Sequence, residues 1–387
     1  MTGRQRRLDE LRETIPQITP REAHASAQDG GVVVDVREHD EVRQGMPDGA
    51  VHLVRGFLEL RVEEAIPDKS KPVHLICATG VRSLFAAESL RALGYHHVSS
   101  VAGGFDRWKQ EQLPVSTPHL LGDDARERFA RHVSIPEVGE EGQLRLLDSK
   151  VLLVGAGGLG SPAALYLAAA GVGTLGIVDD DVVDRSNLQR QILHGDSRVG
   201  TAKVQSAART LHDLNPLVQV EQHGVRLDRN NVEWMFDGYD VVVDGTDNFA
   251  TRYLVNDACV KLGLPNVHGS IFRFEGQVSV FWPSYEKRRG PCYRCVFPEP
   301  PPAALAPSCA EAGVLGVLPG VIGTLEAVEA IKILLGIGDP LVGRMLHYDA
   351  LQQRFTELRL EPDPDCAYCA DGVEFPGYVD YDGFCSR

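Results

Sequence analysis

Four of the eight cysteines in this chain form two C-x-x-C pairs, Cys292 with Cys295 and Cys366 with Cys369. Four thiolates in two short pairs are what a tetrahedral structural zinc site requires. Both pairs lie in proline-rich or terminal segments, whereas a redox-active pair normally sits at a turn from a strand into a helix. The spacing therefore favours zinc, with redox pairs or free thiols as the alternative. Because four cysteines leave no open coordination position, the metal would be structural.

Cys77 stands between a predicted strand and a predicted helix, followed by Gly80, Arg82 and Ser83. Backbone N–H groups at the start of a helix favour a thiolate and stabilise a terminal persulfide anion. Arg82 adds positive charge, and Gly80 permits the tight turn. This setting favours a nucleophile over a structural cysteine. Cys259, in the middle of a predicted helix, is interpreted as a core residue.

A glycine-rich run, Gly155, Gly157, Gly158 and Gly160, follows the predicted strand Lys150–Val154 and precedes a predicted helix. Glycines allow a tight turn and close approach of the backbone, and the free N–H groups of the helix attract phosphate. Asp179 ends the next predicted strand, roughly 20 residues on, where an acid usually holds a ribose hydroxyl. These features indicate an adenine nucleotide, and taken alone they favour a nicotinamide dehydrogenase.

Charged residues further along favour a triphosphate. Arg190 lies just past Asp181, and Lys203 follows. A dehydrogenase does not need these cations, whereas an enzyme that splits a triphosphate meets the charge developing on the phosphoryl oxygens with preorganised cations. Asp247 follows the predicted strand Asp240–Asp244, and a carboxylate at that end of a parallel strand can hold Mg²⁺. Singly, Asp247 could instead cap the next helix, and Lys203 could be a solvated surface residue.

The order of the predicted elements divides the chain into two parts. A length of 387 residues exceeds one ordinary core. Strands at 32–35 and 72–77 alternate with helices such as 83–93, which predicts a parallel sheet covered on both faces, in a domain spanning 15–118. A linker at 119–124 precedes a second domain, 125–370, and a tail, 371–387.

The second domain keeps an alternation of strands and helices to about Gly263 and then changes character. We predict an extended strand over 271–282, a proline-rich stretch over 283–307, a helix over 320–335 and closing strands over 345–360. The fold class is therefore α/β, a parallel domain followed by a Rossmann-like domain with a mixed sheet.

Composition restricts the function classes. Hydrophobic residues make up 43% and charged residues 24% of the chain, as in soluble globular proteins. The net charge of -15 argues against general nucleic-acid binding, which needs a basic surface. No apolar run follows the arginines near the N-terminus, and the most apolar helical stretch, 162–173, is too short to cross a bilayer. We expect a cytoplasmic protein without membrane contact.

The glycine run, the segment Ser186–Gln191, the segment Thr246–Asn248 and the cysteine pairs, in this order, resemble the molybdopterin-synthase adenylyltransferase family (MoeB/ThiF), relatives of ubiquitin-activating enzymes. The resemblance covers essentially all of 123–369. It implies that ATP and Mg²⁺ activate the C-terminal glycine of a ubiquitin-fold sulfur carrier protein ending in Gly-Gly, as an acyl-adenylate. It also implies a homodimer, because Arg131 matches an arginine that family members supply across the dimer interface.

The same resemblance assigns roles in the nucleotide site. It implies that Asp179 holds the ribose, that Asn187, Arg190 and Lys203 hold the phosphates, and that Asp247 holds the magnesium. The full predicted set is Gly155, Gly157, Gly158, Gly160, Asp179, Asp181, Asn187, Arg190, Gln191, Lys203, Asp247 and Asn248. Cys309 matches the cysteine of the family's crossover loop. It is either a buried inert thiol or one that meets the activated carboxylate or resolves an acyl-disulfide.

The segments Asp35–Glu38, Cys77–Ser83 and Val101–Trp108 look like a single rhodanese domain over roughly 18–118. Two features depart from the familiar pattern. The Gly-His-Ile-Pro-Gly-Ala run is replaced by Gly45–Ala50, which lacks the histidine, so donor preference could differ. The rhodanese module also precedes the adenylating module, whereas familiar fusions carry it last. The tail with Cys385 has no explanation in the sequence.

Together, the two modules predict a sequence of steps. Adenylation gives a mixed anhydride, a persulfide on Cys77 displaces AMP to form an acyl-disulfide, and reduction, with Cys309 as a candidate thiol, leaves a thiocarboxylate on the carrier. Fusion raises the effective concentration of one intermediate near the other. The persulfide would come from a cysteine desulfurase or thiosulfate.

Three alternatives stay open: a nicotinamide oxidoreductase, a non-enzymatic scaffold, and an activating enzyme that passes its carrier on through a Cys309 thioester without the rhodanese module. The pathway is also open among molybdopterin (molybdenum cofactor), thiamin, tRNA thiolation, cysteine and thio-siderophore synthesis.

Overall fold

The computed structural model describes residues 2–301, 313–381 and 383, and the chain forms two compact units that divide between Leu120 and Leu121. The division falls inside the predicted linker 119–124. The last two residues of that linker already belong to helix α7 (Asp123–Arg128). None of the helices among these residues is both long and apolar enough to cross a membrane.

The first unit has the predicted parallel sheet, with the strand order β1-β6-β5-β2-β4. Its strands are β1 (Gln17–Ile18), β2 (Val32–Asp35), β4 (Val51–His52), β5 (Pro72–Ile76) and β6 (His97–Val101). Its helices are α1 (Gly3–Thr14), α2 (Pro20–Gln28), α3 (His39–Val42), η1 (Arg55–Phe57), α4 (Leu58–Ala65), α5 (Arg82–Ala92) and α6 (Gly104–Gln110). Alternating strand residues point to opposite faces, so Val34 packs against α1, α4 and α5 while Val33 packs against α2 and α6.

The turn that departs from the rhodanese pattern is packed into this unit. Met46 and Pro47 form β3, which pairs with β7 (Val115–Ser116) in a separate antiparallel ladder. Met46 is buried, and the carbonyl oxygen of Gly45 accepts a hydrogen bond from the guanidinium of Arg37 at 2.8 Å. The altered segment is therefore held by the hydrophobic core and by a buried cation without its usual histidine.

The second unit has a mixed eight-stranded sheet, which confirms the predicted fold class. Its order is β10-β9-β8-β11-β12-β13-β14-β15, parallel from β10 to β12 and antiparallel from β12 onward. The strands are β8 (Lys150–Val154), β9 (Thr174–Val178), β10 (Gln219–His223), β11 (Val241–Asp244), β12 (Asn266–Phe272), β13 (Glu275–Phe281), β14 (Arg344–Asp349) and β15 (Arg354–Arg359).

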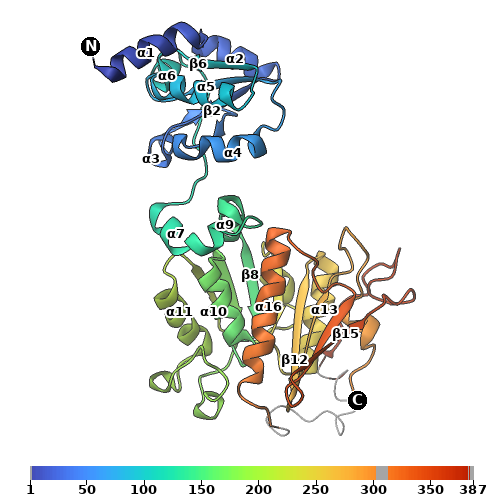
Figure 1. Cartoon of the computed structure of the whole chain (residues 1–387). Helices are drawn as coiled ribbons and strands as arrows, with labels where there is room; N and C mark the ends of the chain where they lie inside the picture. The colour runs from blue at the N-terminus through green and yellow to red at the C-terminus, as the bar shows by residue number, and fades with distance from the viewer. Residues whose placement is uncertain (1, 302–312, 382, 384–387) are drawn as a thin grey trace. The chain divides into compact units, whose positions relative to one another are not determined.

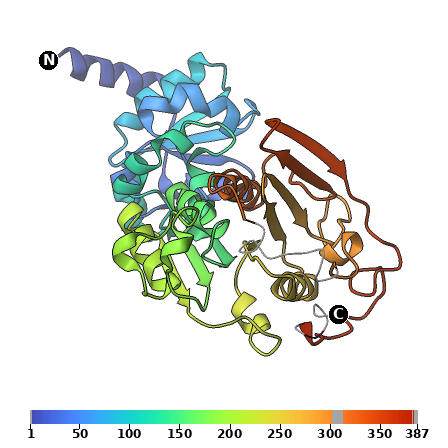
Figure 2. The same ribbon diagram turned by 90° about the horizontal axis from the view of Figure 1, so that it is seen from below.

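Helices cover both faces of this sheet (Figures 1 and 2). One face packs against α9 (Gly139–Asp148), α10 (Gly160–Ala170), α11 (Lys203–Leu214) and α16 (Leu318–Leu335). The opposite face packs against α12 (Val232–Phe236), α13 (Phe249–Leu262) and α14 (Tyr293–Val296). The unit also contains α8 (Ala130–Val133), η2 (Arg185–Asn187) and η3 (Asp196–Arg198). With both faces covered, β8 and β11 are almost wholly apolar, as buried parallel strands are.

One predicted element was wrong. The expected single strand over 271–282 is the second half of a hairpin, in which β12 already begins at Asn266 and pairs back against β13. The chain reverses at Arg273, whose φ of 53° is in the left-handed region. Because no glycine, proline or asparagine marks this reversal, the sequence carries no turn signal there.

The tail that the sequence left unexplained packs against α13 over its described residues. The Tyr381 hydroxyl donates a hydrogen bond to the buried Asp257 carboxylate at 2.7 Å. The Lys261 ammonium lies 5.3 Å from the centre of the Phe375 ring and 5.5 Å from that of Tyr378. Aromatic and polar contacts therefore anchor this part of the tail to the second unit.

Candidate functional site

The strand order of the second unit creates a crevice at the carboxyl ends of its parallel strands. From β8 the chain continues to β9 and β10 on one side, and then returns to place β11 on the other side of β8. Loops after β8 and β11 therefore diverge, and open parallel sheets bind ligands at such a switch point. The glycine run follows β8, Asp179 follows β9, and Asp247 follows β11.

A pocket of 390 Å³ lies at this point, large enough for a nucleotide. Ten predicted residues line it: Gly155, Gly157, Gly158, Asp179, Asp181, Arg190, Gln191, Lys203, Asp247 and Asn248. The lining also includes residues outside the predicted set of site residues: Asp180, Val225, Arg226, Leu227, Thr246, Thr251 and Arg252. Four carboxylates and four cationic side chains thus line one cavity, which offers cations to phosphate groups and carboxylate oxygens to a metal ion.

The turn after β8 depends on glycine at two positions. Gly155 has a φ of +100°, in the left-handed region that side chains disfavour. A Cβ at Gly160 would lie 1.9 Å from the carbonyl oxygen of Gly155. Gly160 is not among the lining residues and closes the turn instead.

Two other predicted residues are also outside the described lining. Asn187 contacts the site through Arg190, whose guanidinium donates a hydrogen bond to its side-chain oxygen at 2.8 Å. Arg131 is exposed on α8.

Lys203 is not a solvated surface residue, because it is only 5% exposed. Its ammonium lies 2.8 Å from the Asp181 carboxylate and 3.8 Å from that of Asp179. Asp179 is itself oriented by the backbone N–H of Ala156 in the glycine turn, at 2.8 Å. These contacts hold a cation and two acids beside the glycine turn before any ligand binds.

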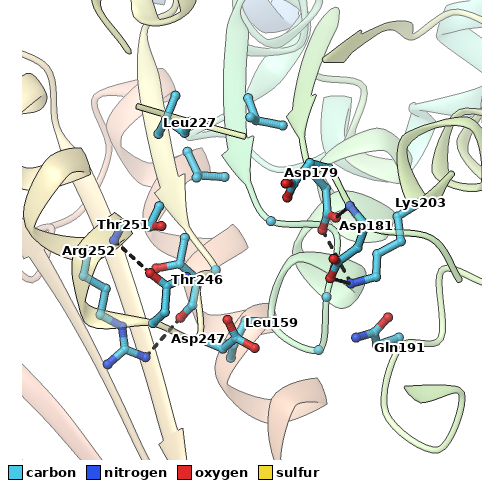
Figure 3. A pocket seen from close by; sticks show the side chains of 18 of the residues that line it. Leu159, Asp179, Asp181, Gln191, Lys203, Leu227, Thr246, Asp247, Thr251 and Arg252 are labelled. Carbon is cyan, nitrogen blue, oxygen red and sulfur yellow. Dashed lines mark hydrogen bonds and ion pairs between the residues drawn. The ribbon is translucent and has the colours of Figure 1, made fainter. Parts of the chain in front are cut away.

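Asp247 does not cap the following helix. The side-chain oxygen of Asn248 accepts the hydrogen bond from the backbone N–H of Thr251 at 2.9 Å and is the N-cap of α13. Figure 3 shows Asp247 on one side of the pocket and Asp181, Lys203 and Gln191 on the other. The Asp247 carboxylate therefore remains an available oxygen ligand for a hard cation such as Mg²⁺.

Most of the residues that sequence analysis missed come from two segments, the first turn of α13 and the loop after β10. Arg252 lies one helical turn after Asn248 on α13, and its guanidinium donates to the carbonyl of Thr246 at 3.0 Å. The four-residue spacing from Asn248 is a signal that could have identified it. Arg226 and Leu227 follow β10, a strand that the sequence analysis did not identify. No sequence signal therefore placed these two residues at the carboxyl end of a strand.

The four paired cysteines meet in a single cluster, as predicted. All four sulfur atoms lie within 4.8 Å of one another, with separations of 3.8 Å for Cys292–Cys295, 3.7 Å for Cys292–Cys366 and 3.4 Å for Cys295–Cys369. These distances are too long for disulfides. Sulfurs around a tetrahedral zinc with bonds of about 2.3 Å lie about 3.8 Å apart, so the cluster fits this ion.

Helix α13 connects the cysteine cluster to the pocket. Arg294, inside the first pair, forms a buried ion pair with Asp257 of α13 at 2.7 Å, and its guanidinium also lies over the Tyr253 and Tyr368 rings. Since α13 begins directly after Asp247 and Asn248, the cluster and the pocket share a helix.

In the first unit, the Cys77 sulfur accepts a hydrogen bond from the backbone N–H of Gly80 at 3.1 Å and lies 3.5 Å from the Ser83 hydroxyl. Gly80 has a φ of +88°, as the predicted tight turn requires. Arg82 is engaged by Glu41, whose carboxylate oxygens accept two hydrogen bonds of 2.6 Å, and this raises the pKa of Arg82. Its charge is thus positioned by Glu41 at the edge of the loop that carries Cys77.

Of the three remaining cysteines, the structure describes Cys259 alone. Cys259 is buried in α13, as predicted, and burial raises the pKa of its thiol. Cys309 and Cys385 lie outside the described residues, so their predicted settings are not tested by the structure.

Comparison with known proteins defines the class. Residues 129–368 match the ThiF family, and residues 19–111 match the rhodanese-like domain. The chain therefore belongs to the ThiF family. Its rhodanese-like domain precedes the ThiF domain in the sequence, which is the order that sequence analysis predicted.

Proteins with similar sequences indicate which activity this class of protein has here. The SAMP-activating enzyme E1 of Haloferax volcanii is 52% identical over 261 residues, covering 67% of this chain and 95% of its own length. The sulfur carrier protein adenylyltransferase of Thermus thermophilus is 50% identical over 280 residues, covering 72% and 98%. The probable adenylyltransferase/sulfurtransferase MoeZ of Mycobacterium tuberculosis is 51% identical over 271 residues, covering 70% and 68%. These relatives confirm the predicted adenylyltransferase with a sulfurtransferase module, and they count against a nicotinamide oxidoreductase.

Solved structures agree on the fold. The crystal structure of E. coli MccB with ATP aligns with a TM-score of 0.54 at 20% identity, over 62% of this chain and 74% of that one. SeMet PaaA aligns with a TM-score of 0.54 at 21% identity, over 70% and 82%. At this identity the likeness supports the fold alone.

Proposed function

We propose that the second unit uses ATP and Mg²⁺ to adenylate the C-terminal glycine of a ubiquitin-fold sulfur carrier protein. The pocket that places Lys203 and Asp247 on facing sides of the glycine turn is the observation that carries this proposal. Cations on one side can meet the phosphates, and a carboxylate on the other can hold the metal. Bound Mg²⁺ would neutralise charge on the phosphate oxygens.

We assign the roles of individual residues from the family resemblance, and their positions in the pocket support the assignment. Asp179 faces the ribose, oriented by the N–H of Ala156. Lys203 and Arg190 hold phosphates, with Asn187 fixing the Arg190 guanidinium. The carrier's carboxylate attacks the α-phosphorus, the bond to the β-phosphate oxygen breaks, and pyrophosphate leaves. The product is an acyl-adenylate.

The rhodanese-like unit would then transfer sulfur. A persulfide anion on Cys77, loaded from a cysteine desulfurase or thiosulfate, attacks the carrier's carbonyl and expels AMP, which gives an acyl-disulfide. A thiol then attacks the Cys77 sulfur, which releases the carrier thiocarboxylate and leaves a disulfide on Cys77. If Cys309 is that thiol, an external dithiol must reduce the resulting disulfide for the next turnover.

The first test measures ATP–pyrophosphate exchange with a panel of ubiquitin-fold proteins ending in Gly-Gly. We expect exchange with one carrier, and a fall of about 100-fold or more for Asp247→Ala because a preorganised charge contact is lost. Asp237→Ala, which removes an exposed carboxylate just before β11, is the matched control and should retain wild-type exchange. Absence of exchange with every carrier would reject the proposal.

A homodimer is part of the proposal, with Arg131 completing the partner's site. We expect Arg131→Ala and Asp247→Ala to be inactive separately, and their mixture to recover about a quarter of wild-type exchange after subunits redistribute, since half of the dimers regain one intact site. Exchange measured against the mixing ratio tests this, with sedimentation to establish the dimer. A mixture as inactive as either variant would place Arg131 in its own subunit's site, and an active Arg131→Ala would place it outside any site.

A further inference from the structure

A buried pair, Asp244 and His268, lies behind the loop that carries Asp247. Asp244 ends β11 and is 1% exposed, and His268 lies on the neighbouring strand β12 at 2% exposure. The imidazole Nδ1–H donates to Asp244 Oδ2 at 2.9 Å. Neither residue lines the pocket. The pair is therefore a second layer behind the nucleotide site.

The other oxygen of Asp244 holds the loop. Its Oδ1 accepts a hydrogen bond from the backbone N–H of Thr246 at 3.1 Å and another from the Thr246 hydroxyl at 2.6 Å. The carbonyl of Thr246 accepts from Arg252 at 3.0 Å. Thr246 is thus fixed on both sides, and its neighbour Asp247 is directed into the pocket.

The charge state of the pair suits this task. Burial lowers the pKa of His268, so the ring is neutral and presents an N–H. Burial also opposes ionisation of Asp244, but the hydrogen bonds from the neutral His268 ring and from Thr246 favour the carboxylate, and the pKa of this carboxyl is lowered. Arg252 contributes favourable charge, whereas the buried Glu326 across the sheet has a raised pKa. Asp244 is therefore an ionised acceptor whose hydrogen bonds are of the stronger, charge-assisted kind.

The ring of His268 is itself immobilised. It packs at 5.6 Å from the Phe281 ring and at 5.1 Å from the Tyr293 ring, measured between centres. Tyr293 directly follows Cys292 of the cysteine cluster, so His268 is held by the structural part of the unit.

We propose that His268 and Asp244 are positioning residues, which set the orientation of the Asp247 carboxylate through Thr246 and thereby raise the affinity of the site for Mg²⁺ and nucleotide. The inference rests on the proposed function of this pocket. Residues that orient a metal ligand from behind typically contribute 10-fold to 100-fold in metal affinity.

The decisive comparison is His268→Phe with His268→Asn. Phenylalanine keeps the aromatic packing and removes the donor, whereas the asparagine amide places an N–H near the position of Nδ1. We expect His268→Phe to weaken Mg²⁺-dependent binding of a non-hydrolysable ATP analogue, measured by calorimetry, about 10-fold or more, and His268→Asn to restore it to within about threefold. His74→Phe, at a buried histidine of the first unit, is the control and should match wild type.

Unchanged Mg²⁺ dependence in His268→Phe, or equal loss in both His268 variants, would overturn the inference. A wild type that binds no Mg²⁺-nucleotide, or an active Asp247→Ala, would instead overturn the proposed function. A second measurement is made on the wild type itself: in protein labelled with ¹⁵N-histidine, the His268 Nδ1–H signal, assigned by its absence from His268→Asn, should shift when Mg²⁺ and the analogue bind. An unshifted signal would contradict the link.

Discussion

Replacing Cys77 by serine will abolish thiocarboxylate formation on the carrier and leave carrier-dependent pyrophosphate exchange within about twofold of wild type. The two activities separate because the adenylating pocket contains no residue of the first unit among those described. Serine nearly preserves the size of the side chain but cannot carry a persulfide, so the Gly80 N–H and the Ser83 hydroxyl would surround an unreactive oxygen. Mass spectrometry of the carrier measures the product, a gain of sulfur in place of oxygen.

The result discriminates between the remaining mechanisms. Thiocarboxylate formed by Cys77→Ser with thiosulfate or a persulfide donor would show that the rhodanese-like unit is dispensable. A carrier thioester that accumulates in Cys77→Ser and disappears in Cys309→Ala would support transfer through Cys309 instead. Loss of exchange in Cys77→Ser, with unfolding excluded by its melting temperature, would show that the two units are coupled in the first step.

The second large effect is expected from the cluster of four cysteines. We expect one zinc ion per chain, and Cys366→Ser should lose it and strongly destabilise the second unit, because structural zinc contributes apparent binding free energies of about 10 kcal/mol or more. The four sulfur atoms lie within 4.8 Å of one another, and without a bound metal ion no bond would hold them at these distances. The buried ion pair of Arg294 with Asp257 would then lose its rigid surroundings, and α13 would loosen where it meets Asp247.

Metal analysis and denaturant unfolding test this expectation. The transition of the first unit is an internal control and should be unaffected, since all four cysteines belong to the second unit. Cys259→Ala, at a buried thiol of α13 outside the cluster, controls for the loss of a core cysteine and should keep its zinc. Wild-type protein without zinc but with two disulfides would show that the pairs are redox centres, the alternative that the spacing left open.

The sequence alone determined the parts whose signals are local. The strand, glycine turn and helix around Gly155–Gly160 follow from an apolar run, glycine backbone freedom and a helix start within a dozen residues. The cysteine pairs predicted a cluster because each pair needs only its own short spacing to bind a metal. The prediction that Cys77 is a nucleophile also rested on local signals, namely a tight turn and the start of a helix. The roles of the residues in the nucleotide site came from the family resemblance, because the spacing of residues does not define them.

Tertiary structure decided which distant residues meet. Whether Asp247 or Asn248 caps α13, and whether Lys203 is solvated or buried beside Asp181, depends on how the loops after β8, β9 and β11 are placed by strand order. The reversal of the hairpin at Arg273 contains no residue typical of turns, so the sequence did not predict it. The pairing of Asp244 with His268 needs two strands in register, because residues 24 apart in sequence become neighbours only when the sheet forms. Patterns along the chain encode local conformation, whereas the geometry of this site is set by strand pairing and packing between segments that are distant in sequence.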